Sequence, residues 1–559
     1  MSSPLQIWEN PMFKAKRVIS AAVIAALVVG FATGPGAEAG GRIPSTVANF
    51  GLYLQESFDL NLEPDNFYAN PDNGDSNQIL RCDGADDPIC TVASSVKTIH
   101  NLPVCSVDDS FDCIKAVWAV DSSGKKIEGK YLNAIPAASK SDHDAIASMK
   151  LSASRGFGGL WQIPGVLNSG GEDKYFVSVR NDVWTYKNSG TLLSTKALES
   201  GSYLTGIVPV KAVTGNYKPM ASRPTWGRLG ATEDSGPKYT PDGQRCTVVD
   251  TGFCELPQEF PEGYRFGMSV QLTQKMNGWF HGRIALPAIA IEPTSNGQLV
   301  VIEAEPVKIS TLDFTIPTEQ VPESVKKIIF ADVDWGIMGD LRQSAQTMLN
   351  GLDNPQTMEI MNAMLPTIGD KATKTSQYWS YRTLAGWNNP EVMKCSSSSS
   401  QVGGVVTTNA LTYSSGPPTF NKETGALEYK VASPHFESGG KVALGSYDLA
   451  VKSDVARCIY GFSNAPISAT ISIIGESGEQ KVATTIVNER NGWLYLSAKG
   501  FTFSSPTIQV KLTQDAVAVA APQAAVPSVK RSTITCIKGK TSKKITAANP
   551  KCPSGYKKK

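Results

Sequence analysis

Short apolar runs separated by turn residues fill the stretch from Cys395 to Leu512. Within Ala469–Ile473, apolar side chains alternate with hydroxyls, which is the pattern of a half-buried β-strand. Asn491 and Gly492 favour a tight hairpin turn, because both residues tolerate positive φ. This spacing predicts an Ig-like β-sandwich over residues 395–513. The runs include Val402–Thr408, Leu427–Val431, Cys458–Phe462, Ala469–Ile474, Val482–Val487 and Trp493–Lys499.

Strand-like patterns also mark the upstream chain. Tyr175–Arg180 and Phe266–Leu272 alternate in the same way. The 559 residues include 49 glycines and 34 prolines, which fits a loop-rich β architecture. The chain is therefore predicted to be mainly β and multidomain, with one or two β-rich domains over residues 40–321.

Residues 322–394 are predicted to form a small helical insert. Asn354 and Pro355 resemble a helix N-cap followed by proline at the first helical position. Apolar residues at helical spacing predict one helix before this point and one after it. The first set is Ile337, Leu341, Ala345, Met348 and Leu352, and the second is Met358, Met361, Met364 and Leu365. Such a methionine stripe either packs in a core, the commoner use, or forms an adaptable binding groove.

Ten cysteines predict five disulfides in an exported chain. Seven residues separate the partners of each of the first three pairs, whereas structural zinc sites favour two to four residues between ligands. Only four histidines accompany them. We therefore predict no metal and no cofactor. The predicted pairs are Cys82–Cys90, Cys105–Cys113, Cys246–Cys254, Cys395–Cys458 and Cys536–Cys552.

Residues 1–39 have the features of a signal peptide. Lys14, Lys16 and Arg17 precede the apolar run Val18–Ala32, and Ala37-Glu38-Ala39 fits a cleavage site. The alternative is an uncleaved membrane anchor, and translation starts at either Met1 or Met12. The run is short for a bilayer span of about 20 residues. We expect a secreted or extracellular protein associated with the cell envelope.

The end of the chain separates into an Ala/Pro-rich linker, residues 514–530, and a basic, disulfide-closed tail, residues 531–559. The formal charge is +2; residues 1–39 contribute +1 and residues 528–559 contribute +10, which leaves −9 for residues 40–527. Within the tail, Ser532–Lys538 and Lys543–Ala547 are predicted to pair as a hairpin across Gly539–Ser542.

A cationic tail on an acidic body predicts contact with an anionic surface. For an exported protein, a cell-wall polymer or a membrane surface is the expected partner, and no nucleic acid is expected. The alternative is a solvated tail that serves solubility. The predicted contact residues are Lys538, Lys540, Lys543, Lys544, Lys557, Lys558 and Lys559.

Two parts of the sequence carry a family resemblance. Ala456–Phe462, the Gly492-Trp493 turn and Gly500–Pro506 resemble a C-terminal β module of uncharacterised secreted actinobacterial proteins. Ile534–Lys540 and Lys551–Lys559 are similar to a basic two-cysteine tail of such proteins. The resemblance covers about the last 105 residues. It implies export and an envelope context, and it assigns no activity.

No catalytic residue is predicted. The sequence has no Gly-x-Ser-x-Gly elbow, no His-Glu-x-x-His motif and no Walker A loop. His281 beside Arg283 stays open as a site, because triads assemble in space. The favoured interpretation is a non-enzymatic binding or structural protein of the cell envelope. The alternative is a secreted hydrolase, for example one that acts on glycans, with carboxylates not yet identified.

Two acidic stretches are weaker candidates. Asp332 and Asp334, with Asp340 nearby, have the oxygen ligands for calcium or the paired carboxylates of a glycoside hydrolase. Asp72–Asn77 also has suitable oxygen ligands but lacks the glutamate that closes an EF-hand loop. In both stretches a turn or a helix cap is the more ordinary use of such residues.

Overall fold

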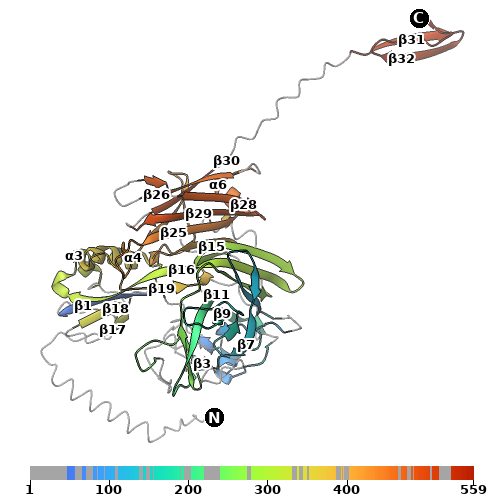
Figure 1. The fold of residues 1–559 in the computed structure, drawn as a ribbon. Helices are drawn as coiled ribbons and strands as arrows, with labels where there is room; N and C mark the ends of the chain where they lie inside the picture. The colour runs from blue at the N-terminus through green and yellow to red at the C-terminus, as the bar shows by residue number, and fades with distance from the viewer. Residues whose placement is uncertain are drawn as a thin grey trace, which may run out of the picture. The chain divides into compact units, whose positions relative to one another are not determined.

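The chain is mainly β, as predicted, in a computed structural model (Figure 1). The structure describes residues 47–559 apart from 57–65, 71–79, 83, 85, 94, 107–110, 137–142, 147–150, 155, 189–190, 194–202, 220–238, 274–277, 330–335, 339–343, 349–351, 385–391, 393, 396–401, 464–466, 475–479, 483, 504–506 and 515–529. The predicted signal peptide and nearly all of the predicted linker lie outside these residues. In the described part of the chain, no helix combines the length and the hydropathy needed to span a membrane.

The chain divides into two compact units. The first ends at Leu512 and excludes residues 462–468; the second comprises those residues and 513–559. The segments predicted as an N-terminal region, a helical insert and a β-sandwich therefore all fall in the first unit.

The upstream strands of the first unit are β1 (Asn49–Leu54), β2 (Asn66–Asn70), β3 (Leu80–Cys82), β4 (Ser95–Asn101), β5 (Cys113–Val120), β6 (Lys126–Glu128), β7 (Lys130–Ala134), β8 (Gly159–Gln162), β9 (Lys174–Asn188), β10 (Thr191–Leu193), β11 (Tyr203–Thr214), β12 (Val248–Asp250), β13 (Phe253–Pro257), β14 (Arg265–Leu272), β15 (Gly278–Thr294) and β16 (Gly297–Pro317). The later strands are β17 (Gly336–Met338), β18 (Ser344–Met348), β19 (Lys374–Tyr378), β20 (Ser380–Thr383), β21 (Val402–Thr408), β22 (Thr412–Tyr413), β23 (Thr419–Asn421), β24 (Ala426–Ala432), β25 (Leu444–Lys452), β26 (Ile467–Ile474), β27 (Gln480–Val482), β28 (Thr484–Arg490), β29 (Trp493–Thr502) and β30 (Thr507–Gln514). The helices are α2 (Pro88–Val92), α3 (Glu323–Ile329), α4 (Pro355–Met364) and α6 (Ser453–Tyr460), with 3₁₀ turns η4 (Thr318–Gln320) and η5 (Leu365–Ile368).

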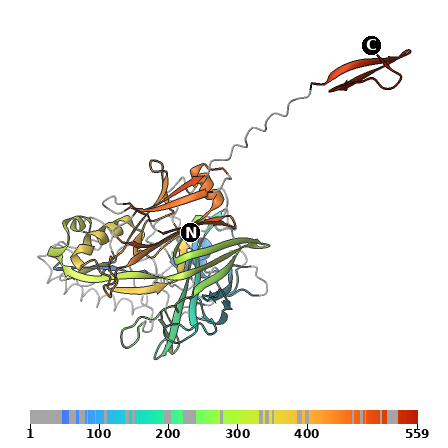
Figure 2. The ribbon, with the colours of Figure 1, turned by 45° about the horizontal axis from the view of Figure 1, so that its top comes forward.

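Two long strands, β15 and β16, connect the sheets of the first unit (Figure 2). The first residues of β15 pair with β20 and, in parallel, with β21, while its later residues pair with β16. Between Ala285 and Ala288 the register shifts, which marks a β-bulge where β15 changes partners. One core runs through this region and includes Trp161, Phe266, Trp379 and Trp493.

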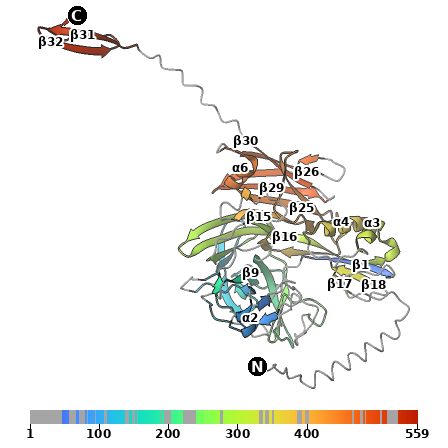
Figure 3. The same ribbon diagram turned by 180° about the vertical axis from the view of Figure 1, so that it is seen from behind.

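The predicted β-sandwich region contains two sheets. Strands β21, β25, β29 and β28 form one layer, and β22, β24, β30, β26 and β27 form the other. Figures 1 and 3 show β26 and β30 lying over β25 and β29. Tyr429 and Tyr447 meet between the layers, with ring centroids 5.7 Å apart. Because β21 also pairs with β15, the first layer continues the upstream sheet.

In this region one predicted turn is confirmed and one predicted strand is wrong. The Asn491-Gly492 turn is confirmed: it joins β28 to β29, and both residues have positive φ, 52° and 75°. The apolar run Cys458–Phe462 is not a strand. Ser453–Tyr460 form helix α6, which ends at Gly461 in the left-handed conformation. A glycine in that conformation is a common way to end a helix.

Of the two helices predicted by apolar spacing in the helical insert, one is present. Helix α4 begins as predicted, because Asn354 caps it by accepting a hydrogen bond from Gln356 N–H (2.8 Å). Met361 and Met364 are buried, which confirms a core face rather than an open groove. The helix predicted through Ile337 and Met348 is wrong: these residues lie in β17 and β18. Leu341 lies outside the described residues.

Strand pairing explains that correction. Five consecutive residues from Ser344 to Met348 pair in parallel with β1, and β17 pairs with β18. The main-chain hydrogen bonds of a neighbouring strand outweigh a weak local helix preference. Figure 3 shows β17 and β18 next to β1, with α3 and α4 nearby.

All five predicted disulfides are present, and the described residues include no free cysteine. The Cα–Cα distances range from 4.8 to 5.9 Å, as normal disulfides require. This many disulfides is typical of proteins that fold in an oxidising compartment.

The second unit contains a small three-stranded sheet in the order β32 (Thr541–Ala547), β31 (Ser532–Lys538), β33 (Lys557–Lys558). The predicted hairpin is confirmed with a shorter loop, since Lys538 pairs with Thr541 and only Gly539 and Lys540 connect the strands. Gly539 has a φ of 58°, which the tight turn requires and glycine adopts without strain.

Candidate functional site

The tail sheet has two chemically different faces. Neighbouring residues of a strand point to opposite faces, and paired residues share a face. Cys536 pairs with Lys543 and Lys558, so these residues and Lys538 lie on one face. We call this the closed face.

The closed face is covered by the segment from Cys552 to Tyr556. Cys552 is bonded to Cys536, which is fully buried. Lys543 Nζ lies 5.6 Å from the centroid of the Tyr556 ring. Gly555 lies close to Lys538, since a Cβ atom at this glycine would be 3.1 Å from Lys538 Nζ. These contacts place the disulfide segment over this side of the sheet.

The opposite face, which we call the open face, carries Thr535, Lys544 and Lys557. Lys559 follows beside Thr535, because its N–H donates to the Thr535 carbonyl oxygen (2.8 Å). All seven lysines predicted as contact residues are exposed. The register places Lys544 and Lys559 on either side of Thr535, so the open face presents three ammonium groups within one small sheet.

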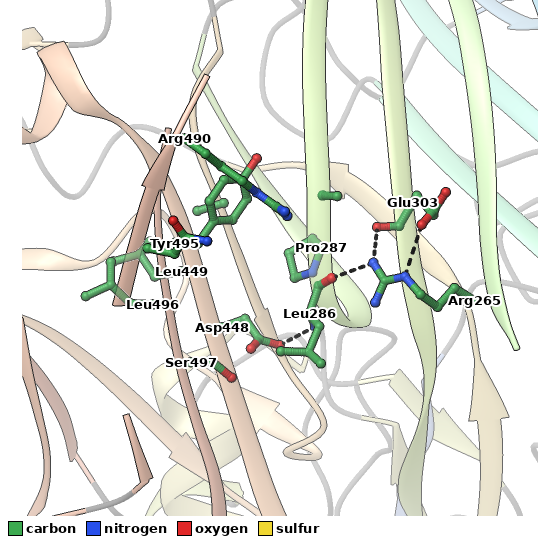
Figure 4. A pocket seen from close by; sticks show the side chains of 13 residues that line it. Arg265, Leu286, Pro287, Glu303, Asp448, Leu449, Arg490, Tyr495, Leu496 and Ser497 are labelled. Carbon is green, nitrogen blue, oxygen red and sulfur yellow. Dashed lines mark hydrogen bonds and ion pairs between the residues drawn. The ribbon is translucent and has the colours of Figure 1, made fainter. Parts of the chain in front are cut away.

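The first unit contains a pocket of about 430 Å³ (Figure 4). One wall is a face of the β25–β29–β28 sheet, where Asp448, Ser497, Tyr495, Asn488 and Arg490 lie in adjacent register positions. The other wall is the bulge of β15. The pocket was missed in the sequence, because its walls come from segments about 200 residues apart.

Two polar contacts hold the backbone of the bulge in place at Leu286. Leu286 has a φ of 49°, which is strained for a residue with a side chain. Its N–H donates to Asp448 Oδ2 (2.8 Å), and its carbonyl oxygen accepts from Arg265 Nη2 (2.9 Å). Pro287 follows and has no N–H that a strand pairing would need. These contacts fix the backbone of the bulge between Asp448 of β25 and Arg265 of β14, at the wall of the cavity.

Asp448 is the most buried polar group of the pocket. Besides the Leu286 N–H, Oδ2 accepts from Thr407 Oγ1 (3.2 Å). Burial raises the pKa of Asp448, and the Ser497 hydroxyl and the Leu286 N–H oppose this shift without cancelling it. Ser497 is directly opposite Asp448 in register, but the contact between its Oγ and Asp448 Oδ1 does not have the geometry of a good hydrogen bond.

The second carboxylate of the pocket, Glu303, is occupied. Oε1 accepts from Arg265 Nε (3.1 Å), and Oε2 accepts from Trp118 Nε1 (3.0 Å). Glu305 lies 3.5 Å from Lys499 Nζ at the edge of this network. Glu303 therefore positions Arg265, and both of its oxygens already accept a hydrogen bond from the protein.

His281 and Arg283 lie in a buried cluster. The His281 ring stacks on Tyr413, with centroids 3.7 Å apart. Burial, followed by the charges of Arg283 and Arg382, lowers the pKa of His281 well below its ordinary value, so the ring stays neutral. Burial also raises the pKa of Tyr413 to about 12. Both residues are buried beside Arg283, which makes a structural role the simplest account.

Arg283 joins three segments: its own strand β15, Glu56, and the stretch from Thr408 to Leu411. Its Nε donates to Glu56 Oε2, and its two terminal nitrogens donate to the carbonyl oxygens of Thr408 (3.1 Å), Ala410 (2.6 Å) and Leu411 (3.0 Å). Its side chain is almost fully buried, and the guanidinium carbon lies 4.4 Å from the Tyr413 ring centroid.

One buried pair was not found in the sequence. Ser152 Oγ and His100 Nε2 lie 2.7 Å apart, the geometry of a nucleophile and its base. Asp112 is close enough for His100 to lower its pKa, although burial raises that pKa overall. Ser152 and His100 are only 3% and 1% exposed, so the pair is a core hydrogen bond. The two residues are 52 positions apart, and no local motif marks them.

The acidic candidates Asp332, Asp334, Asp340 and Asp72–Asn77 lie outside the described residues. Among the residues that the structure describes, no group of three or more His, Cys, Asp or Glu side chains is arranged to hold a metal ion.

Comparisons of the chain with protein-family models, curated proteins and solved structures gave no match.

Proposed function

We propose that this is a secreted, envelope-associated binding protein without catalytic activity, whose tail contacts an anionic polymer of the cell wall. The observation that carries the proposal is the tail sheet. Its basic residues are unopposed, since residues 528–559 contain ten basic side chains and no acidic one. The proposal includes export of the chain, which its resemblance to secreted actinobacterial proteins implies.

The tail is built to hold its charges in place. A two-stranded hairpin is marginally stable alone. Here a third strand is added, and a disulfide closes a loop of 16 residues, worth about 3 kcal/mol in loop entropy. The open face therefore displays Lys544, Lys557 and Lys559 on a stiffened scaffold, which reduces the entropy lost on binding.

The alternative is a secreted, glycan-directed hydrolase. Glycoside hydrolysis usually uses a pair of carboxyl groups that both face the substrate. In the pocket of the first unit, both oxygens of Glu303 are held by protein donors, and Asp448 has one oxygen without a well-formed partner. Because Glu303 is engaged by Arg265 and Trp118 and Asp448 is almost fully buried, this pair supports binding better than hydrolysis.

Removing the tail is expected to abolish most of the binding to purified cell walls. Each lysine near an anionic surface contributes about 1 kcal/mol, so a chain ending at Ala525 should bind at least ~tenfold more weakly. Exposed charges are screened beyond about 8–10 Å at physiological ionic strength, so binding of the full chain should fall with salt. Cosedimentation with cell walls at low and high salt measures both effects.

Two controls identify the partner. Vesicles with anionic lipids replace the walls in one arm, and stronger retention there would assign the tail to a membrane surface. Equal retention of the full and shortened chains on cell walls, or retention indifferent to salt, would contradict the proposal and favour a solubilising tail.

A further inference from the structure

We propose that the pocket between the β25–β29–β28 face and the β15 bulge binds one hydroxylated sugar ring that carries a carboxylate, such as a uronic acid. The pocket has about 430 Å³, at the lower end of the roughly 300–1,000 Å³ range of small-molecule sites. The bulge and the strained Leu286 shape it, and bulges are over-represented beside functional sites.

The inner end of the pocket has hydrogen-bonding capacity for a ligand hydroxyl. Asp448 and Ser497 are 2% and 5% exposed. The Ser497 hydroxyl lowers the pKa of Asp448, yet neither Asp448 Oδ1 nor Ser497 Oγ forms a hydrogen bond of good geometry, as buried polar atoms usually do. A ligand hydroxyl both donates and accepts, so it satisfies both atoms whether or not the Asp448 carboxyl carries a proton.

The outer end of the pocket provides a free cation. Arg490 lies over the Tyr495 ring, with its guanidinium carbon 4.8 Å from the centroid, and it is exposed. Arg265 and Lys499 are each ion-paired with a glutamate. In the described part of the chain, Arg490 has no such acidic partner. Its planar guanidinium matches a carboxylate in a two-bond geometry.

The ring of the ligand fits between the two walls. Figure 4 shows Pro287 on the β15 side and Tyr495 on the facing strand, with Asp448 and Ser497 at one end and Arg490 at the other. The Tyr495 hydroxyl donates to the Ile289 carbonyl oxygen (3.2 Å), which fixes the orientation of its ring. Apolar walls with polar groups at both ends are typical of small-molecule sites.

The test is calorimetric titration of the full chain with D-glucuronate, D-glucose and propionate. A ligand of this size is expected to bind with a Kd on the order of 1 mM. Glucose lacks the carboxylate and propionate lacks the hydroxyls, so each should bind about tenfold more weakly, a difference of ~1.4 kcal/mol. Arg490→Gln should weaken glucuronate about tenfold and leave glucose unchanged. Ser497→Ala should weaken both sugars.

Arg457→Gln is the matched control. It removes the same charge on the other side of this sheet, where Arg457 pairs with Glu489 (3.0 Å), and it should leave glucuronate binding unchanged. The absence of saturable glucuronate binding up to ~10 mM would overturn the site. Equal affinity for glucose and glucuronate would overturn the carboxylate requirement. Equal losses in the two arginine variants would overturn the role of Arg490.

This inference is independent of the tail. A chain ending at Ala525 is expected to bind glucuronate as the full chain does, so failure of the pocket proposal and failure of the tail proposal are distinguishable.

Discussion

Replacing Arg283 with methionine is expected to lower the free energy of unfolding by about 3–5 kcal/mol, because it breaks a buried ion pair and removes the donor to several carbonyl oxygens. The variant removes the Arg283 guanidinium from Glu56 and from the carbonyl oxygens of Thr408, Ala410 and Leu411. Urea denaturation with the disulfides intact measures the loss.

A double-mutant cycle separates the ion pair from the rest of the cluster. Adding Glu56→Gln to Arg283→Met removes the carboxylate charge that Arg283 balances, so the double variant should lose less stability than the sum of the single variants. Arg457→Met is the surface control. Its partly exposed pair with Glu489 should contribute at most about 1 kcal/mol. Similar losses in Arg283→Met and Arg457→Met would contradict a structural role for Arg283.

Removing the Cys395–Cys458 disulfide by two alanine substitutions is expected to cost about 4 kcal/mol of stability. This disulfide has the largest sequence separation of the five, 63 residues. The chain entropy that a cross-link removes from the unfolded state grows with the length of the closed loop. The bond also joins helix α6 to Cys395, near the start of the β-sandwich region.

The Cys105–Cys113 disulfide provides the matched comparison. It has a separation of 8 residues, so the same double alanine substitution should cost about 2.5 kcal/mol. Urea unfolding curves of the two variants measure the difference. A larger loss for the short loop than for the long one would show that native-state contacts, and not loop length, determine the contribution of these disulfides.

Features that depend on neighbouring residues were predictable from the sequence. Asn354 and Pro355 indicated the start of α4, because a cap bonds to an N–H two residues away. Asn491 and Gly492 indicated their turn, since both tolerate positive φ. The five disulfides followed from spacing and number, and the tail hairpin followed from its alternating pattern and its glycine.

Features that depend on distant segments were not predictable. The residues of β17 and β18 have apolar spacing typical of a helix, yet β18 lies beside β1, which is almost 300 residues away. The parallel pairing of β15 with β21 joins regions that look like separate domains in the sequence. The pocket depends on Leu286 being held by Asp448, and no local pattern relates these two residues.

The same distinction explains the candidate sites. The lysines of the tail were recognisable from composition alone, whereas their division between two faces required the strand register and the disulfide segment. Arg490 belongs to an ordinary hairpin in the sequence. Only its position in the same pocket as Asp448 and Ser497 makes it a candidate ligand-binding residue.

The most direct test of the proposed function compares two triple glutamine variants of the full chain in cosedimentation with cell walls. One replaces Lys544, Lys557 and Lys559 on the open face, and the other replaces Lys538, Lys543 and Lys558 on the closed face. Both remove three charges, so they differ only in position. The first should bind about tenfold more weakly than the second at low salt, and this difference should shrink at high salt. Equal binding of the two variants would contradict contact through the open face, and binding equal to that of the unmodified chain would contradict the tail as the contact.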